Sequence, residues 1–175
     1  MTRVVGVDPG TLSIDVCGMV DGQLYLDHSW PTAEALSEPA AFIQLLTTSG
    51  PPDLIVGPSG YGLPLRFASE ATKRDLRLAF LAPADETGGI GGLRALARML
   101  GSSGLPVVYV PGVIHLDTVP EHRKLNRVDL GTADKLCAAV LGIHEQCRRR
   151  NHDSEESSFI LLELGGAFTA GLAVE

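Results

Sequence analysis

An acidic residue stands at the end of the first apolar run of the chain, directly before a turn. Residues 4–7 are rich in valine and predict a buried strand, which Pro9 stops. Asp8 is therefore expected at the tip of a hairpin, followed by one glycine and two hydroxyl residues: Gly10, Thr11 and Ser13. Glycine lets backbone N–H groups approach a phosphate, hydroxyls donate hydrogen bonds, and a carboxylate can hold magnesium directly or through its waters. The alternative is an ordinary turn with a solvated aspartate.

A second glycine hairpin with the same order of residues lies near the other end of the sequence. The stretch FILLELGGAFTAGLAVE holds an apolar run, an acid near its end, a glycine turn and a hydroxyl. The turn residues are Gly165, Gly166 and Thr169. Two hairpins of this kind, far apart in the sequence, can close on a phosphate chain from opposite sides.

The densest polar cluster is RKLNRVDLGTADK, at residues 123–135. Arg127 and Asp129 precede an expected helix whose first turn holds Asp134 and Lys135, and a helix N-terminus favours anions. Arg127 or Lys135 could neutralise the charge of a transferred phosphate, while Asp129 or Asp134 could act as a base or a metal ligand. The alternative is a set of helix caps and surface ion pairs.

A glycine-rich loop, GPSGYGLP, follows a short buried strand at residues 53–56. Loops at this place in α/β sheets usually hold ligands, so we expect a substrate or phosphate loop that includes Ser59, Gly60 and Tyr61. A serine hydrolase would need a GxSxG elbow, and Pro58 removes an N–H group from this loop. An ordinary turn is the alternative.

The composition limits the classes of function. The chain has 175 residues, of which 45% are hydrophobic and 20% charged, and its net charge is −7, so we expect a globular protein that binds neither nucleic acid nor membrane. No apolar run is long enough to span a membrane, and we expect a cytoplasmic location. The three cysteines, Cys17, Cys137 and Cys147, form no CxxC pair, and their apolar surroundings predict buried thiols.

The remaining elements follow from apolar patterns between turn residues. The chain opens with three antiparallel strands, the third at residues 22–30. We then expect a helix within 31–49, strands at 53–56 and 106–111, helices through 93–100 and from Thr132, and two final strands. Strands that alternate with helices after an antiparallel meander predict a mixed α/β sheet flanked by helices.

Four motifs together resemble one protein superfamily. GVDPGTLSIDVCG resembles the first phosphate motif of the sugar kinases, heat-shock chaperones, actin and acetate kinase, whose ATPase domains have ribonuclease H-like folds. LELGGAFTAGLAV resembles the second phosphate motif, as found in acetate and butyrate kinases. With DLIVGPSGYGLP and NRVDLGTADKLC, nearly the whole chain is similar to a smaller group of uncharacterised proteins described as predicted butyrate kinases.

The resemblance implies a phosphotransferase that uses ATP and magnesium on a small molecule, such as a short-chain carboxylate. Asp8, with Gly10 and Thr11, would belong to the first phosphate hairpin, and Gly165, Gly166 and Thr169 to the second. Ser59, Arg127, Asp129 and Asp134 would be candidates for substrate or catalytic roles.

The resemblance also implies that the nucleotide is held between two domains. Residues 1–157 would form the first domain and 158–175 the start of the second, so the chain would be an N-terminal half whose final strand can pair in a homodimer. Two other classes remain as alternatives: an interaction or regulatory module that kept the fold, and a metal-dependent nuclease of the resolvase type. A nuclease needs several carboxylates for two metals, and the chain has Gly57 and Pro58 where such an enzyme carries a glutamate.

Overall fold

A computed structural model describes residues 1–10, 12–83, 85–86, 89–165 and 169–175. The first part of the chain forms a six-stranded sheet in the order β3-β2-β1-β4-β6-β5. The strands are β1 (Arg3–Pro9), β2 (Ser13–Val20), β3 (Gln23–Pro31), β4 (Leu54–Val56), β5 (Arg66–Phe67) and β6 (Val107–Tyr109). β1, β2 and β3 are antiparallel, whereas β4 is parallel to β1 and to β6. The expected mixed α/β sheet with an opening meander is thus confirmed.

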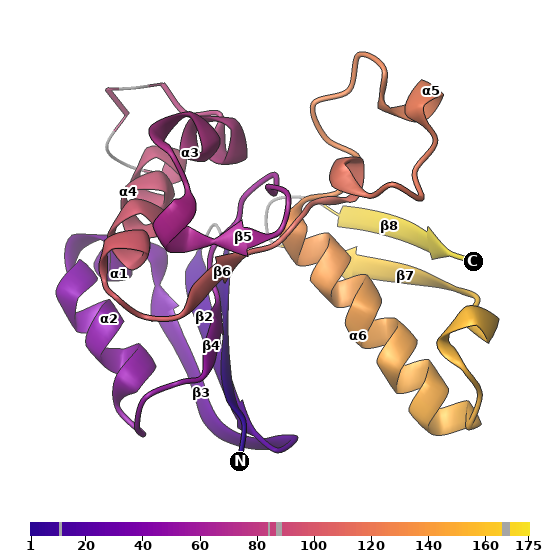
Figure 1. Ribbon diagram of the computed structural model, residues 1–175, viewed down its shortest axis with the longest axis horizontal. Helices are drawn as coiled ribbons and strands as arrows, with labels where there is room; N and C mark the ends of the chain where they lie inside the picture. The colour runs from indigo at the N-terminus through magenta and orange to yellow at the C-terminus, as the bar shows by residue number, and fades with distance from the viewer. Residues whose placement is uncertain (11, 84, 87–88, 166–168) are drawn as a thin grey trace.

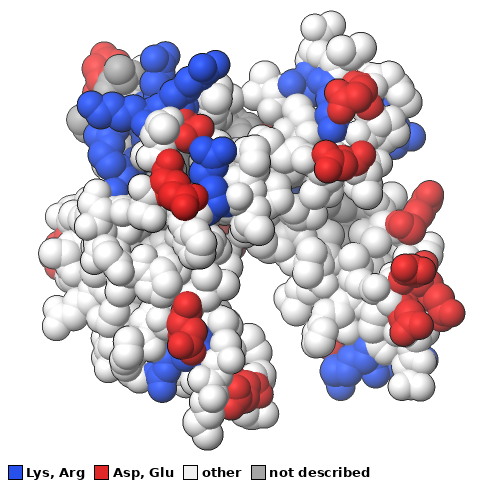
Figure 2. Space-filling model, in the orientation of Figure 1, with Lys and Arg blue, Asp and Glu red and all other residues white. Residues whose placement is uncertain are grey.

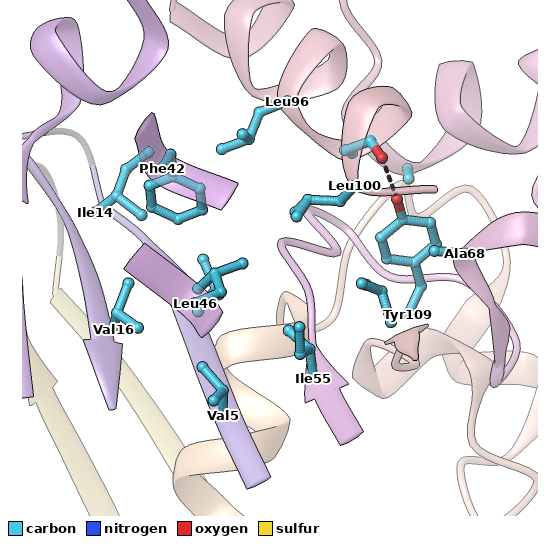
Figure 3. Packing of buried hydrophobic residues seen from close by; sticks show 14 of the residues in the cluster. Val5, Ile14, Val16, Phe42, Leu46, Ile55, Ala68, Leu96, Leu100 and Tyr109 are labelled. Atoms are coloured by element: carbon cyan, nitrogen blue, oxygen red, sulfur yellow. Dashed lines mark hydrogen bonds between the residues drawn. The ribbon is translucent and has the colours of Figure 1, made fainter. Parts of the chain in front are cut away.

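Four helices lie together on one side of this sheet (Figure 1). They are α1 (Thr32–Ser37), α2 (Pro39–Thr47), α3 (Lys73–Phe80) and α4 (Gly89–Ser102). Figure 3 shows how Val5, Val16 and Ile55 of the sheet point toward Phe42 and Leu46 of α2, all of them fully buried. Side chains alternate between the two faces of a strand, so Asp8 lies on the face of β1 opposite to Val5 and Val7.

The helix expected within residues 31–49 is in fact two helices. α1 ends at Ser37, and Glu38 has φ −123° and ψ 58°, outside the helical region. Pro39 explains the break, because the ring of a proline excludes the helical conformation at the preceding residue. Proline is well tolerated at the first position of a helix, where α2 begins.

Three short elements were not expected from the sequence: β5, α3 and α5 (Glu121–Lys124). α3 is only eight residues long, but it begins with a capping box in which Thr72 and Asp75 each accept a backbone hydrogen bond from the other. α3 has only three buried apolar positions, Leu76, Ala79 and Phe80, and its first three residues are charged, so the sequence shows little helical periodicity.

The last part of the chain forms α6 (Ala133–Arg150) and a hairpin of β7 (Phe159–Leu164) and β8 (Thr169–Val174). Figure 1 shows α6 starting beside the upper edge of the six-stranded sheet and running away from it. α6 contacts β8 and the short helical turns at Val113–His115 and Ser154–Glu156. The domain boundary expected at residue 157 stays a prediction. No helix within the described ranges is long and apolar enough to cross a membrane.

The expectation that all three cysteines are buried is wrong. Cys17 and Cys137 are exposed, and Cys147 is half-buried. In β2 the buried positions are Ile14, Val16 and Gly18, which face the helices, so Cys17 points to the opposite face. The apolar neighbours in the sequence therefore did not mean that the thiol was in the core.

Candidate functional site

Asp8 is the last polar residue of β1, on the face of the sheet that the α1–α4 helices leave uncovered. It lies directly opposite Asp15 of β2 in the strand register. Its pKa is raised above the ordinary value of 3.8, first by partial desolvation and then by the negative charge of Asp134. Asp15 and Glu163 add to the increase, while Lys135 opposes it. Asp8 is thus surrounded by mostly negative charge.

The turn after Asp8 is tied to helix α1. The backbone N–H of Gly10 donates to the carbonyl of Asp8 over 3.2 Å, and Oγ1 of Thr32 donates to the carbonyl of Gly10 over 2.9 Å. A Cβ atom on Gly10 would lie 2.7 Å from the carbonyl oxygen of Ser13, so the turn requires glycine here. Thr32, which holds the turn in place, was not among the expected site residues. Thr11 lies outside the described residues.

The hydroxyl of Ser13 is engaged within the same hairpin. It donates to Oδ2 of Asp15 over 3.0 Å. Ser13 is therefore next to the candidate phosphate turn, as expected, but its hydroxyl is hydrogen-bonded to the carboxylate of Asp15, two residues later. A phosphate would have to compete with Asp15 for this hydroxyl.

The strongest charge interactions of the site lie at the start of α6. The ammonium of Lys135 donates to Oδ2 of Asp134 and to Oε1 of Glu163, the latter over 2.5 Å. The Lys135 side chain is only 6% exposed. Burial disfavours its charge, but the hydrogen bonds to Asp134 and Glu163 outweigh burial and raise the pKa of Lys135.

The pKa of Asp134 is lowered as a result of these contacts. Its own burial acts in the opposite direction, but hydrogen bonds from Lys135 and Thr132 stabilise the carboxylate form. Thr132 occupies the N-cap position of α6, yet its side chain does not cap the helix.

Three elements therefore bring charged groups to one place: β1 with Asp8, the first turn of α6 with Asp134 and Lys135, and the end of β7 with Glu163. These groups are close enough to change the pKa of Asp8. Figure 2 shows that the surface is hollowed between the part of the molecule that carries the six-stranded sheet and the part that carries α6, β7 and β8.

The residues of the second hairpin lie next to this cluster. Thr169 begins β8 and pairs in register with Leu164 of β7, the residue directly after Glu163, whose carboxylate contacts the buried Lys135. Gly165 is exposed, and Gly166 lies outside the described residues. A cavity of about 230 Å³ opens between β8 and the segment before α6. It is lined by Asp129, Leu130, Gly131, Thr132, Lys135, Ala170, Gly171 and Leu172.

The two other expected residues of the polar cluster have different surroundings. Oδ1 of Asp129 accepts a hydrogen bond from the N–H of Gly131 over 2.6 Å, which shapes the turn into α6. Asp129 also lines the cavity, whereas Arg127 is exposed and is not among the residues around it. The structure thus brings Asp8 and Asp134 together, with Asp129 at the adjoining cavity.

The loop after β4 connects the sheet to α6. Oγ of Ser59 donates to the carbonyl of Gly57 and accepts from the N–H of Val110, both over 3.0 Å, so this buried hydroxyl joins the ends of β4 and β6. The carbonyl of Gly60 accepts from the N–H of Ala133 over 3.1 Å, at the first residue of α6. The observed contacts are therefore structural, and the substrate role expected for Ser59, Gly60 and Tyr61 stays a prediction.

Of the two charged residues at the centre of the site, Glu163 was not among the expected site residues, and Lys135 was expected only as a possible partner of a phosphate. The signal for Glu163 was present, because it is an acid near the end of an apolar strand, as Asp8 is. The burial of Lys135 between two carboxylates depends on packing that the order of residues does not reveal.

A metal site made wholly of protein ligands is not present among the described residues, since they contain no group of three His, Cys, Asp or Glu side chains that could hold an ion. Lys135 already occupies one oxygen of Asp134 and one of Glu163. Asp8 remains the carboxylate that magnesium bound to phosphate could reach, directly or through its waters.

Comparison with known proteins gives one family. A family model with the description "Protein of unknown function (DUF1464)" matches residues 6–175. No curated protein matches the sequence. The matched range includes both hairpins and the whole charged cluster, from Asp8 to Glu163.

Proposed function

The chain belongs to the DUF1464 family of proteins of unknown function, and we propose that it binds the phosphates of magnesium-ATP and acts as a phosphotransferase on a small molecule. The observation that carries this proposal is the convergence of Asp8, the first turn of α6 and the end of β7 at one place. The end of β1 and the end of β7, which lead into the two glycine turns, both lie at this place, although almost the whole length of the chain separates them in sequence. The proposal keeps the cytoplasmic location expected from the sequence.

The topology of the sheet supports a ligand site at this edge. β1, β4 and β6 are parallel, so their carboxyl ends lie at the same edge, and ligands of open α/β sheets bind beyond that edge. The N-terminus of the 18-residue helix α6 is held there by the bond from Ala133 to Gly60. A helix N-terminus presents backbone N–H groups and a partial positive charge to an anion.

Each residue of the site would then have a separate role in binding phosphate or magnesium. The N–H groups around Gly10 and Gly165 would approach the phosphates, and the hydroxyl of Thr169 would donate to them. Asp8 would hold the magnesium ion of the nucleotide. Magnesium, when bound, would neutralise charge on the phosphate oxygens during transfer.

The phosphoryl acceptor is the part of the proposal that depends most on the resemblance. A short-chain carboxylate is an anion, and a cation near the transfer site would favour its binding. Arg127 is exposed on the segment that leads into the cavity beside β8, and its neighbour Asp129 lines that cavity. We propose Arg127 as the residue that attracts the acceptor.

Calorimetric titration of the chain with magnesium-ATP tests the proposal. We expect binding that Asp8→Ala weakens at least about tenfold. Asp27→Ala is the matched control, because Asp27 is an exposed carboxylate on the edge strand β3. Equal affinity for the wild type and the Asp8 variant would exclude Asp8 from the site.

One observation favours a second function, that of an interaction module. The outward face of β7 carries three large apolar side chains, Ile160, Leu162 and Leu164, which are 76%, 67% and 80% exposed. Such a face is typical of a surface that another chain covers, including a second copy of this protein. A folded chain without affinity for magnesium-ATP that forms a stable dimer in sedimentation would favour this function over the kinase.

A further inference from the structure

Lys135 lies between two carboxylates that come from different elements. Its Nζ atom donates to Asp134 in the first turn of α6 and to Glu163 at the end of β7. The exposed fractions are 6% for the Lys135 side chain, 33% for Asp134 and 35% for Glu163. The ammonium is therefore the buried centre of the group, and the two carboxylates form its outer sides.

The charge balance of the site depends on this one ammonium. Among the described residues, the charged groups with the largest effects on the pKa of Asp8 are the carboxylates of Asp134, Asp15 and Glu163, which raise it, and the ammonium of Lys135, which lowers it. Without the ammonium, Asp8, Asp134 and Glu163 would repel one another in partly desolvated surroundings. Proteins resolve such a conflict by protonating an acid or by binding a cation.

We infer that Lys135 is a resident cation that takes the place of a divalent metal between Asp134 and Glu163. Its ammonium occupies the carboxylate oxygens that a metal would need, and it holds the end of β7 against the first turn of α6. Asp134 and Glu163 are then anchors of the second hairpin and not metal ligands. The inference concerns the protein without nucleotide and holds whether or not the chain is a kinase.

An ordinary surface salt bridge in the same chain shows the difference. Lys124 pairs with Glu121 one helical turn earlier, and the side chains are 17% exposed for the lysine and 88% for the glutamate. A pair of this kind contributes little to stability because water solvates its carboxylate well even without the lysine. Removing the buried Lys135 leaves two half-buried carboxylates without a counter-ion, which is far more destabilising than leaving one exposed carboxylate without its partner.

The test measures thermal unfolding and the binding of Mn²⁺, both without nucleotide. The variants are Lys135→Met, Glu163→Gln, the double variant Lys135→Met/Glu163→Gln, and Lys124→Met as the matched control. Unfolding is followed with and without millimolar Mg²⁺ or Ca²⁺ at constant ionic strength, and free Mn²⁺ is counted by electron paramagnetic resonance.

We expect the wild type and Lys124→Met to show no dependence on divalent cations. Lys135→Met should unfold about 10 °C lower, recover part of this loss in Mg²⁺ or Ca²⁺, and bind one Mn²⁺. The double variant should be more stable than Lys135→Met and bind no Mn²⁺, because one of the two carboxylate charges is gone. If Lys135→Met does not fold, the double variant should still fold.

Three results would overturn the inference. The first is wild-type binding of Mn²⁺ that Glu163→Gln abolishes, since the carboxylates would then be metal ligands despite Lys135. The second is a Lys135→Met protein as stable as the wild type. The third is a destabilised Lys135→Met protein that no divalent cation restores, or a double variant that is no more stable than it.

Discussion

Nζ of Lys135 lies 2.5 Å from Oε1 of Glu163, a residue 28 positions later in the sequence. This contact joins the start of α6 to the end of β7, so the tip of the second hairpin is fixed relative to the helix. The same helix is fixed to the six-stranded sheet by the bond from Ala133 to Gly60. Two contacts of the first turn of α6 therefore help to hold the second hairpin in its position relative to Asp8.

Asp8→Asn should stabilise the protein at neutral pH. The pKa of Asp8 is raised in the folded state, so its contribution to stability is complete below 3.8 and is lost as the pH rises through the folded-state value. The ionised form is thus unfavourable at pH 7, and asparagine removes that cost. Because Asp8 is only partly desolvated and water screens its charge, we expect the melting temperature to rise by only about 1–2 °C at pH 7 and not to differ near pH 3.

Scanning calorimetry of the wild type and Asp8→Asn across this pH range measures the effect. Asp27→Asn on β3 is the control and should follow the wild type. A less stable Asp8→Asn protein at pH 7 would show that the carboxylate makes a favourable contact in the folded state.

In contrast to Asp8, the ionised form of Asp134 should stabilise the folded protein, and this stabilisation should be lost in acid. Its pKa is lowered in the folded state, so its contribution is complete above 3.8 and is lost as the pH falls through the folded-state value. We expect Asp134→Asn to unfold at a lower temperature than the wild type at pH 7, with the gap closing as the pH falls below 3.8 and through the folded-state pKa. Melting curves by circular dichroism measure it, and a gap that is constant with pH would contradict an ionic role for Asp134.

The rate at which Cys137 of α6 reacts with thiol reagents should depend on how close Asp8 of β1 lies to it. Desolvation, Asp134 and Asp8 raise the pKa of this exposed thiol, in that order. Thiol reagents react with the thiolate, so Asp8→Asn should speed the labelling of Cys137 roughly twofold at pH 8. Peptide mass spectrometry separates Cys137 from Cys17 and Cys147. An unchanged rate would mean that Asp8 lies too far from the first turn of α6 for the proposed site.

Ser59→Ala should destabilise the protein by about 1–3 kcal/mol. The variant leaves the N–H of Val110 without the hydroxyl that accepts its hydrogen bond. Ser59 is only 4% exposed, so water cannot easily replace that hydroxyl. Urea unfolding measures the change. Thr48→Ala is the control, because the exposed hydroxyl of Thr48 donates to the backbone carbonyl of Gln44. If Ser59 instead binds substrate, the variant should keep its stability and lose acceptor binding.

The sequence alone was sufficient for the features that depend on neighbouring residues. A valine-rich run predicted β1 and alternating apolar residues predicted β2, the turn at Pro9 and Gly10 placed Asp8 near a strand end, and the repeated acid and glycine pattern predicted the second hairpin. These signals are local, because side-chain alternation and turn geometry depend on a few consecutive positions. The mixed sheet follows from the order of such elements.

Only the tertiary structure decided how distant groups are paired. Nothing in the sequence around Lys135 indicated that its ammonium is buried against Glu163, or that the hydroxyl of Ser59 is used by the backbone of β6. The exposure of Cys17 was likewise hidden, because the strand has an uncovered face. Burial and charge pairing are set by which elements pack together, and residues far apart in the chain meet only once the whole fold has formed.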